Sequence, residues 1–366
     1  MTLRSIGLVV HGGKEEARDT AARLRRWAAE RGTQVAEFDV WSGDGARESV
    51  RAQVDEAEPM DLVVTVGGDG TFLRGVAVAQ VADVPVLGVD VGRVGFLTEV
   101  RPEHLLEALA LFEAGEAVLE ERLTVTARAS RPLRIPGELE SLLRYGRGPT
   151  LPPPEVHDGD PDAVGWGVEV DLTALNDVVF EKLSRDRQAS LGVYVGHRLF
   201  ASYSADAVVV STPTGSTAYS FAAGGPVVSP RAQVLVFTPV APHMVFDRTF
   251  VVAADEVISV RVLERSGRVA MSVDGQIRAV LDPGDWVAVH ARPWKVQLVR
   301  LRTPDFYGRV RRRLGVTDST AAVADGRLDP LYVPAAPRPA SMAHLHLPLV
   351  EPEPEDGRDG HGVAGA

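Results

Sequence analysis

A glycine-rich loop with a single acid, Gly67-Gly68-Asp69-Gly70-Thr71, has the clearest chemical character in the sequence. Its three glycines let the backbone approach a phosphate closely, and a helix that begins there adds its positive N-terminus. An acid in such a loop repels phosphate unless it holds a metal ion or accepts a proton from a hydroxyl group. We therefore take Gly67, Gly68 and Thr71 as a phosphate loop and Asp69 as the catalytic candidate. A tight Asp-Gly turn without chemistry explains the same residues and remains the alternative on this loop alone.

A second polar segment, Ser211–Pro226, follows the apolar run 207–210. It places six serine and threonine side chains within ten residues, which makes a poor core element and a good lining for a ribose, an adenine edge or an amide. Tyr219 offers a ring that can stack on a base. The alternative is a polar loop that caps a helix at Thr217.

Together with Leu175-Asn176-Asp177 and Val273-Asp274-Gly275-Gln276, these segments occur in the order and spacing of NAD kinases. Val91–Glu99 resembles the Gly-Phe-Leu-Thr segment of that family, and the resemblance covers residues 4–130 and 166–316. Diacylglycerol, sphingosine and phosphofructokinase-type kinases share the glycine–aspartate loop. The Thr-Gly-Ser-Thr-Ala-Tyr-Ser run is the part specific to NAD kinases.

The resemblance implies phosphoryl transfer from ATP or polyphosphate to the 2′-hydroxyl of the adenosine ribose of NAD, which yields NADP. It implies that Asp69 deprotonates this hydroxyl and that Gly70 and Arg74 lie near the phosphates and the nucleotide. Asn176 and Asp177 match a pair that contacts the adenine and its ribose. The other implied dinucleotide contacts are Arg187, Asp206 at the nicotinamide end, Gln276 at the far end, and the stretch Thr217, Ala218, Tyr219, Ser220, Phe221 and Ala222. Arg187 in a solvated charged turn, and Gln276 as a plain hairpin residue, are the alternatives.

The implied cofactor is a divalent cation, most simply Mg²⁺ bound with the donor, because few lysines lie near the motifs. No metal ligand is assigned. The implied partners are NAD, ATP or polyphosphate, and further copies of the chain in a homodimer or homotetramer.

Composition excludes several other classes of function. The 366 residues contain no cysteine, so disulfides, thiolate metal sites and cysteine nucleophiles are absent. A net charge of −11 disfavours nucleic-acid and membrane-surface partners. No stretch approaches about 20 uninterrupted apolar residues, and we expect a cytoplasmic protein.

Two other functions fit parts of the sequence. A lipid or other small-molecule kinase would share the glycine–aspartate loop, but it needs an apolar acceptor pocket where Thr214–Ser220 is polar. A non-catalytic dinucleotide-binding module is the third possibility, and Asp69 argues against it.

The elements that must position these motifs fall into two groups. Before residue 121, apolar strands alternate with helices, which predicts a parallel sheet covered on both faces. The expected strands are Ile6–Val10, Gln34–Val40, Leu62–Val66 and Val84–Val89, and the expected helices are Glu15–Arg31 and Glu103–Ala114. After residue 121, the sequence contains short valine-rich runs that are typical of a β-rich, sandwich-like domain. These runs are Leu123–Ala129, Trp166–Leu172, Asn176–Phe180, Leu191–Val195, Ala207–Ser211, Phe250–Val252, Val257–Leu263, Val269–Val273, Trp286–His290 and Val296–Leu301.

We therefore predict an α/β domain at residues 1–122 that carries the phosphate loop, and a β-rich NAD-binding domain at residues 123–300. Residues 131–166, rich in proline, are expected to form a mobile surface insertion, with a short helix at Leu139–Tyr145. Residues 301–317 form a C-terminal segment, with a helix at Asp305–Leu314, that is expected to return to the first domain. Residues 318–366 hold eight acids and three arginines and are expected to be a disordered acidic tail.

Overall fold

The computed structural model describes residues 2–40, 50–92, 95–144, 153–156, 165–184, 187–318 and 339–346. The chain divides into two compact units, Met1–Leu301 and Arg302–Ala366. All of the predicted site residues belong to the first unit. No helix in the described ranges combines the length and the apolar character needed to cross a membrane.

The N-terminal part of the first unit is an α/β fold with a parallel sheet, as predicted. Its strands lie in the order β2-β1-β3-β4, and α1 buries an apolar stripe formed by Ala17, Ala21, Leu24 and Ala28. The strands are β1 (Ser5–Val10), β2 (Gln34–Glu37), β3 (Leu62–Gly67) and β4 (Val86–Asp90). The helices are α1 (Glu15–Arg31), α2 (Val50–Glu56), α3 (Asp69–Ala82), the 3₁₀ turn η1 (Pro102–His104) and α4 (Leu105–Ala114).

The C-terminal part is an antiparallel β-sandwich, again as predicted. One of its sheets has the order β12-β11-β10-β7-β14-β15, and the other faces it across a valine-rich core. Its elements are β5 (Val118–Ala129), β6 (Val168–Ala174), β7 (Asp177–Lys182), β8 (Ala189–Val195), β9 (Arg198–Ala205), β10 (Ala207–Ser211), η2 (Gly215–Thr217), α6 (Tyr219–Ala222), β11 (Val234–Val240), β12 (Phe250–Ala253), β13 (Ile258–Val262), β14 (Val269–Val273), β15 (Gln276–Leu281) and β16 (Trp286–Arg300).

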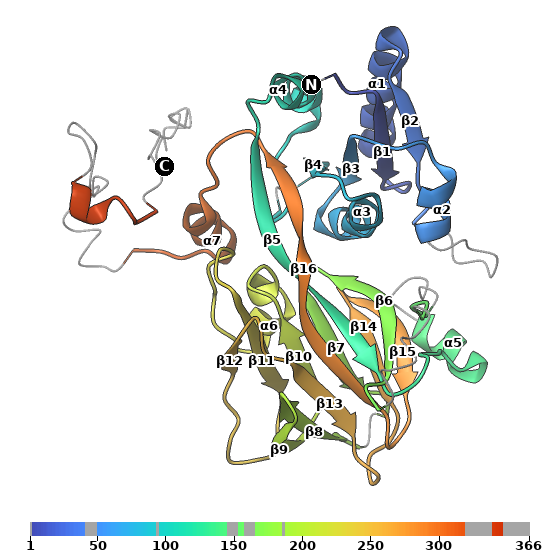
Figure 1. Ribbon diagram of the computed structural model, residues 1–366, viewed down its shortest axis with the longest axis vertical. Helices are drawn as coiled ribbons and strands as arrows, with labels where there is room; N and C mark the ends of the chain where they lie inside the picture. Colours follow the sequence, from blue (N-terminus) through green and yellow to red (C-terminus); the bar gives the residue numbers. More distant parts are fainter. Residues whose placement is uncertain are drawn as a thin grey trace, which may run out of the picture. The chain divides into compact units, whose positions relative to one another are not determined.

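One long strand, β16, connects the two parts. Its second half pairs in parallel with β4 at Leu298, and its first half pairs antiparallel with β13. Along most of its length it lies beside β5 (Figure 1). The two strands that we expected at 286–290 and 296–301 are therefore one. Pro293 falls at a bulge between Ala291 and Lys295, where a missing N–H costs no ladder bond.

Because of this continuous pairing, the α/β part and the sandwich are not separated at the predicted boundary. The predicted boundary between residues 122 and 123 lies inside β5, and the parallel strands and one sandwich sheet form a single ten-stranded sheet. Three strands were not anticipated from the sequence: β9, β11 and β15. Pro239 interrupts the pattern of β11, and β15 directly follows the Asp274-Gly275 turn, so neither resembles an isolated apolar run.

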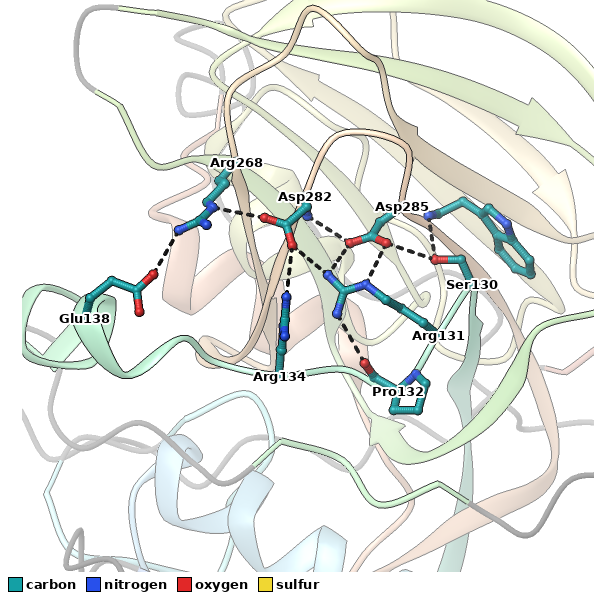
Figure 2. A network of polar contacts seen from close by, with 9 residues as sticks. Ser130, Arg131, Pro132, Arg134, Glu138, Arg268, Asp282 and Asp285 are labelled. Atoms are coloured by element: carbon teal, nitrogen blue, oxygen red, sulfur yellow. Dashed lines mark hydrogen bonds and ion pairs between the residues drawn. The ribbon is translucent and has the colours of Figure 1, made fainter.

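The described beginning of the proline-rich insertion is anchored to the sandwich. Residues Gly137–Arg144 form α5, whose Leu143 packs on Ile277 and Val280 of β15. Arg131 pairs with Asp282 at 2.9 Å and with Asp285 at 2.6 Å, in the network drawn in Figure 2. This part is therefore more firmly held than we expected. Residues 145–152 and 157–164 lie outside the described residues.

The second unit contains the predicted helix as α7 (Phe306–Leu314), which begins where the Asp305 carboxylate accepts from the Gly308 N–H at 2.8 Å. Arg311, Arg312 and Arg313 are exposed, as expected for a helix face in solvent. A short 3₁₀ turn, η3 (Ala340–Met342), follows. The rest of the predicted acidic tail, 319–338 and 347–366, is outside the described residues.

Candidate active site

The glycine–aspartate loop spans the carboxyl end of β3 and the first turn of α3, with Gly68 between them. In parallel sheets this edge is where ligands bind. Gly67 packs so tightly under Thr71 that a Cβ there would overlap the threonine side chain. Thr71 is consequently 2% exposed, and its hydroxyl lies over the loop. Gly70 is exposed, so its backbone is open to a ligand at the start of the helix.

The Asp69 carboxylate is held by the turn at residues 95–98. It accepts from the backbone N–H groups of Phe96 at 2.8 Å, Leu97 at 3.1 Å and Thr98 at 3.3 Å, and from the Thr98 hydroxyl at 3.3 Å. A Cβ at Gly95 would overlap this carboxylate, so only glycine fits there. The turn thus fixes the orientation of Asp69.

Asp90, at the end of β4, is a second acid at this edge that sequence reasoning missed. It is 1% exposed, and its Oδ2 has no hydrogen-bond partner in the described structure. Burial raises the pKa of Asp90; a Thr98 hydrogen bond opposes this effect, and the charge of Asp69 adds to it. Its place beside the β3 loop, at the end of the next parallel strand, was the available signal.

A cavity of about 560 Å³ opens along β7. Positions 177, 179 and 181 face it, because alternate residues of a strand share a face. Its lining residues are Asn176, Asp177, Val179, Glu181, Ala218, Tyr219, Ser272, Asp274 and Gly275. Val179, Glu181 and Ser272 were not predicted, although the strand alternation from Asp177 pointed to the first two.

Two acids line this cavity, the buried Asp177 and the half-buried Asp274. Asp274 accepts from the backbone N–H groups of Leu175, Asn176 and Asp177 at 3.0, 2.7 and 3.1 Å. Burial raises the pKa of Asp274 to about 6, against the effect of these three donors. Burial, followed by the charge of Asp274, raises the pKa of Asp177 to about 7, while a bond from the Tyr219 N–H opposes the shift. A carboxyl group that changes charge near neutral pH therefore borders the cavity.

The hydroxyl groups of the Ser211–Pro226 segment mostly serve the fold, contrary to the expectation that they line a ligand. Five of these side chains are buried: Ser211, Thr212, Thr214, Ser216 and Ser220. The Ser216 hydroxyl bonds to the carbonyl of Pro213 at 2.7 Å, and the Ser220 hydroxyl bonds to Thr238 at 2.9 Å. A short, tightly turned segment satisfies its polar groups internally. Ala218 and Tyr219 line the cavity, and Phe221 and Ala222 are exposed.

Arg74 of α3 and Gln276 of β15 connect the α/β part of the first unit with the sandwich. With its amide oxygen turned toward α3, Gln276 accepts from the Arg74 guanidinium at 2.7–3.1 Å. Both side chains line a smaller cavity of about 200 Å³ that also touches Asp274. The helix that follows the phosphate loop is thereby joined to the hairpin that supports Asp177.

Buried apolar residues also hold three of the motifs close together. Phe72 of α3, Leu97 of the turn and Leu175 of the Leu-Asn-Asp motif belong to one buried cluster. Three segments far apart in sequence therefore share one packing unit beneath the site.

Asp206 lies away from this group. Asp206 pairs with Lys182 at 2.5 Å. In the β7–β10 ladder Ser211 faces Asp177 and Ala207 faces Glu181, so Asp206 lies at the far end, roughly 16 Å from Asp177 at about 3.3 Å per residue. Glu181 extends the cavity toward that end. Arg187 is exposed, and its neighbours at 185 and 186 are outside the described residues.

The part of the chain that the structure describes contains no group of three or more metal-ligating side chains. Proteins commonly bind Mg²⁺ through one or two carboxylates, with substrate phosphates and water completing the shell. Asp69 and the Oδ2 of Asp90, which has no hydrogen-bond partner in the described structure, are suited to supply these one or two carboxylates.

Comparison with known proteins identifies close relatives. Residues 6–117 match the ATP-NAD kinase N-terminal domain, and residues 175–301 match the ATP-NAD kinase C-terminal domain. NAD kinase 1 of Streptomyces coelicolor is 57% identical over 357 residues, 98% of each chain. NAD kinase of Symbiobacterium thermophilum is 38% identical over 258 residues, 70% of this chain and 80% of the relative.

Two solved structures share the fold. Yeast NADH kinase complexed with NADH aligns with a TM-score of 0.67 at 22% identity, covering 87% of this chain and 89% of the other. An NAD kinase from Archaeoglobus fulgidus in complex with ATP aligns with a TM-score of 0.55 at 21% identity, covering 85% and 96%.

Proposed function

Because this chain belongs to the NAD kinase family, we propose specific roles for its site residues in phosphorylating NAD. The enzyme transfers a phosphoryl group to the 2′-hydroxyl of the adenosine ribose of NAD and produces NADP. ATP is the family's phosphoryl donor. We include polyphosphate as a second donor to be tested.

Asp69 is the proposed general base. A ribose hydroxyl is a weak nucleophile at neutral pH, so a carboxylate that accepts its proton speeds the attack on the terminal phosphorus. The turn at 95–98 directs three of its donors at Oδ1 and only the Phe96 N–H at Oδ2, so Oδ2 is the Asp69 oxygen with lone-pair capacity left for the ribose hydroxyl. The open backbone at Gly68 and Gly70 and the N-terminus of α3 favour donor phosphates next to that carboxylate.

The 560 Å³ cavity is the proposed adenosine site. Asn176 and Asp177 offer polar contacts to adenine and ribose, and Tyr219 offers a ring face. The observation that carries this assignment is the Arg74–Gln276 contact, because it joins the phosphate-loop helix to the hairpin at the cavity floor. Glu181 and Asp206 then lie along the direction in which the nicotinamide half extends.

We propose Mg²⁺ as the divalent cation that accompanies the donor, with Asp69 and Asp90 as the nearby carboxylates. When bound, the cation neutralises charge on the donor phosphates. We also propose that the enzyme works as a homodimer or homotetramer. Sedimentation analysis of the full chain would contradict this proposal by giving a monomer at working concentrations.

Asp69→Asn tests the base. The amide keeps the shape but cannot take up the ribose proton, so we expect kcat to fall about 10²–10⁴-fold while NAD binding stays within a few-fold. The measurements are NADP formation with Mg-ATP and calorimetric NAD binding without donor.

The matched control is Asp61→Asn. Asp61 lies at the opposite end of β3 and also accepts backbone N–H groups, from Arg4 at 2.7 Å and Ser5 at 3.1 Å. It should lower stability and leave kcat unchanged. Wild-type turnover by Asp69→Asn would refute the base role, whereas loss of NAD binding would indicate a binding role instead.

A further inference from the structure

A buried ion network lies where β5 and β16 run side by side. Arg300 has a side chain that is 2% exposed, and its Nε donates to Glu120 at 2.8 Å. The other oxygen of Glu120 accepts from Arg122 at 2.8 Å, and Glu99 lies 3.3 Å from Arg300. Two arginines and two glutamates thus balance in charge, and of the four only Glu99 belongs to a segment that the sequence analysis singled out.

One end of this network reaches the turn that holds Asp69. The Nη1 of Arg300 donates to the carbonyl of Leu97 at 2.7 Å, and the N–H of the same Leu97 donates to Asp69 at 3.1 Å. Only one residue therefore separates the guanidinium from the carboxylate.

The other end reaches the polar segment beside the cavity. The Nη1 of Arg122 donates to the Thr214 hydroxyl at 3.2 Å. Thr214 is 5% exposed, and Ala218 and Tyr219, four and five residues later, line the adenosine cavity. Glu120 bonds to both arginines, so it links the turn around Asp69 to this segment.

Stability alone is a poor explanation for such a network. Removing two charges from water is costly, and apolar residues of similar volume are often as stable or more stable. Burial acts to raise the pKa of Glu120, but Arg122 and Arg300 outweigh it and hold that pKa below its usual range. The network stays charged, and the planar guanidinium of Arg300 fixes the direction of each bond that it makes.

We propose that Arg300 is a positioning residue for Asp69, acting through the Leu97 carbonyl, and that Glu120 holds the Arg300 guanidinium in place. The inference rests on the proposed role of Asp69 as the base. Arg300 holds the Leu97 carbonyl on the side of the turn away from the carboxylate, so the N–H groups of residues 96–98 stay directed at Asp69. A displacement of about 1 Å in a reacting group can cost on the order of 10²-fold in rate.

Arg300→Lys and Arg300→Met test this proposal. Lysine keeps the charge but lacks the planar guanidinium that donates to Glu120 and Leu97 in fixed directions. Methionine keeps only a similar side-chain volume. We expect kcat to fall about 10-fold for lysine and about 100-fold for methionine. The NAD dissociation constant, measured without donor, should stay within about twofold of wild type because the cavity lining is untouched.

Arg131→Lys and Arg131→Met are the matched controls. Arg131 also pairs with two acids, Asp282 and Asp285, and donates to a carbonyl, that of Pro132 at 3.4 Å (Figure 2). None of these contacts leads to the turn at 95–98. The controls should lower the unfolding temperature while kcat per folded site stays at the wild-type value.

The double variant Asp69→Asn/Arg300→Lys separates this inference from the base role. If Arg300 acts through Asp69, the double variant is no slower than Asp69→Asn alone. A further 10-fold loss in the double variant, wild-type kcat in Arg300→Lys, or equal losses of kcat and NAD affinity would each overturn the positioning role. Full activity of Asp69→Asn would instead overturn the base role itself. Should Arg300→Met fail to fold, Arg300→Lys decides the question.

Discussion

At the scale of single residues, backbone N–H groups control the carboxylates of this site more than charged side chains do. Asp69 accepts three of them from the turn at 95–98, and Asp274 accepts three from residues 175–177. Such donors orient a carboxylate without neutralising it by an ion pair. The arrangement suits a reaction in which both the substrates and the active-site acids are negatively charged.

Asp177 gives the site a dependence on pH that can be measured. Burial holds its pKa at about 7 in the folded protein, against 3.8 as its ordinary value. The folded state therefore binds the proton more tightly, and this contribution to stability is lost as the pH rises from about 4 through 7.

The wild type should lose unfolding free energy between pH 5 and pH 8 as Asp177 ionises. We predict that Asp177→Asn makes this loss smaller by about 2–3 kcal/mol, at about 1.4 kcal/mol per pH unit. Urea unfolding at the two pH values measures it. Asn176→Ala, a neighbour that does not ionise, should keep the wild-type difference. An Asp177→Asn protein with an unchanged pH dependence would show that this carboxyl group is charged throughout the range.

At the scale of elements, the sequence identified runs with clear boundaries. The strands at 207–211 and 269–273 agree with prediction to the residue, because apolar runs end there at polar or glycine-containing turns. The helix at 15–31 also agrees, since Gly32 adopts φ 71° at its end. Contacts between distant segments had no such signal. The pairing of β16 with β4, the burial of Ser220 and the position of Asp90 all depend on neighbours that the local pattern does not reveal.

The helix α5 provides a test at this scale, because two kinds of contact anchor it. Leu143 is 6% exposed against β15, whereas Glu138 forms an exposed pair with Arg268 at 3.2 Å. We predict that Leu143→Ala lowers the unfolding free energy by about 2–3 kcal/mol, through lost burial and a residual cavity. Glu138→Ala should cost less than about 1 kcal/mol, because surface ion pairs contribute little. Denaturant unfolding compares them, and equal effects would mean that α5 is not held by its apolar face.

At the scale of the whole molecule, the α/β part and the sandwich share structure. A unit of 301 residues is near the size at which chains separate into independent domains. Here β16 belongs to both parts, pairing with β4 at one end and β13 at the other (Figure 1). The buried network of Arg300, Glu120 and Arg122 lies on the same pair of long strands.

We therefore predict that residues 1–301 unfold as one cooperative unit. Hydrogen exchange at increasing denaturant should show the buried amides of β3 and those of β10 opening with the same free energy and the same denaturant dependence. Leu298→Ala is the informative variant, because Leu298 is 1% exposed and is the residue of β16 that pairs with β4. Weakening this joint should let the β3 segment open at lower denaturant than the β10 segment. Separate transitions already present in the wild type would mean that the two parts fold independently and that β16 connects them without coupling their stability.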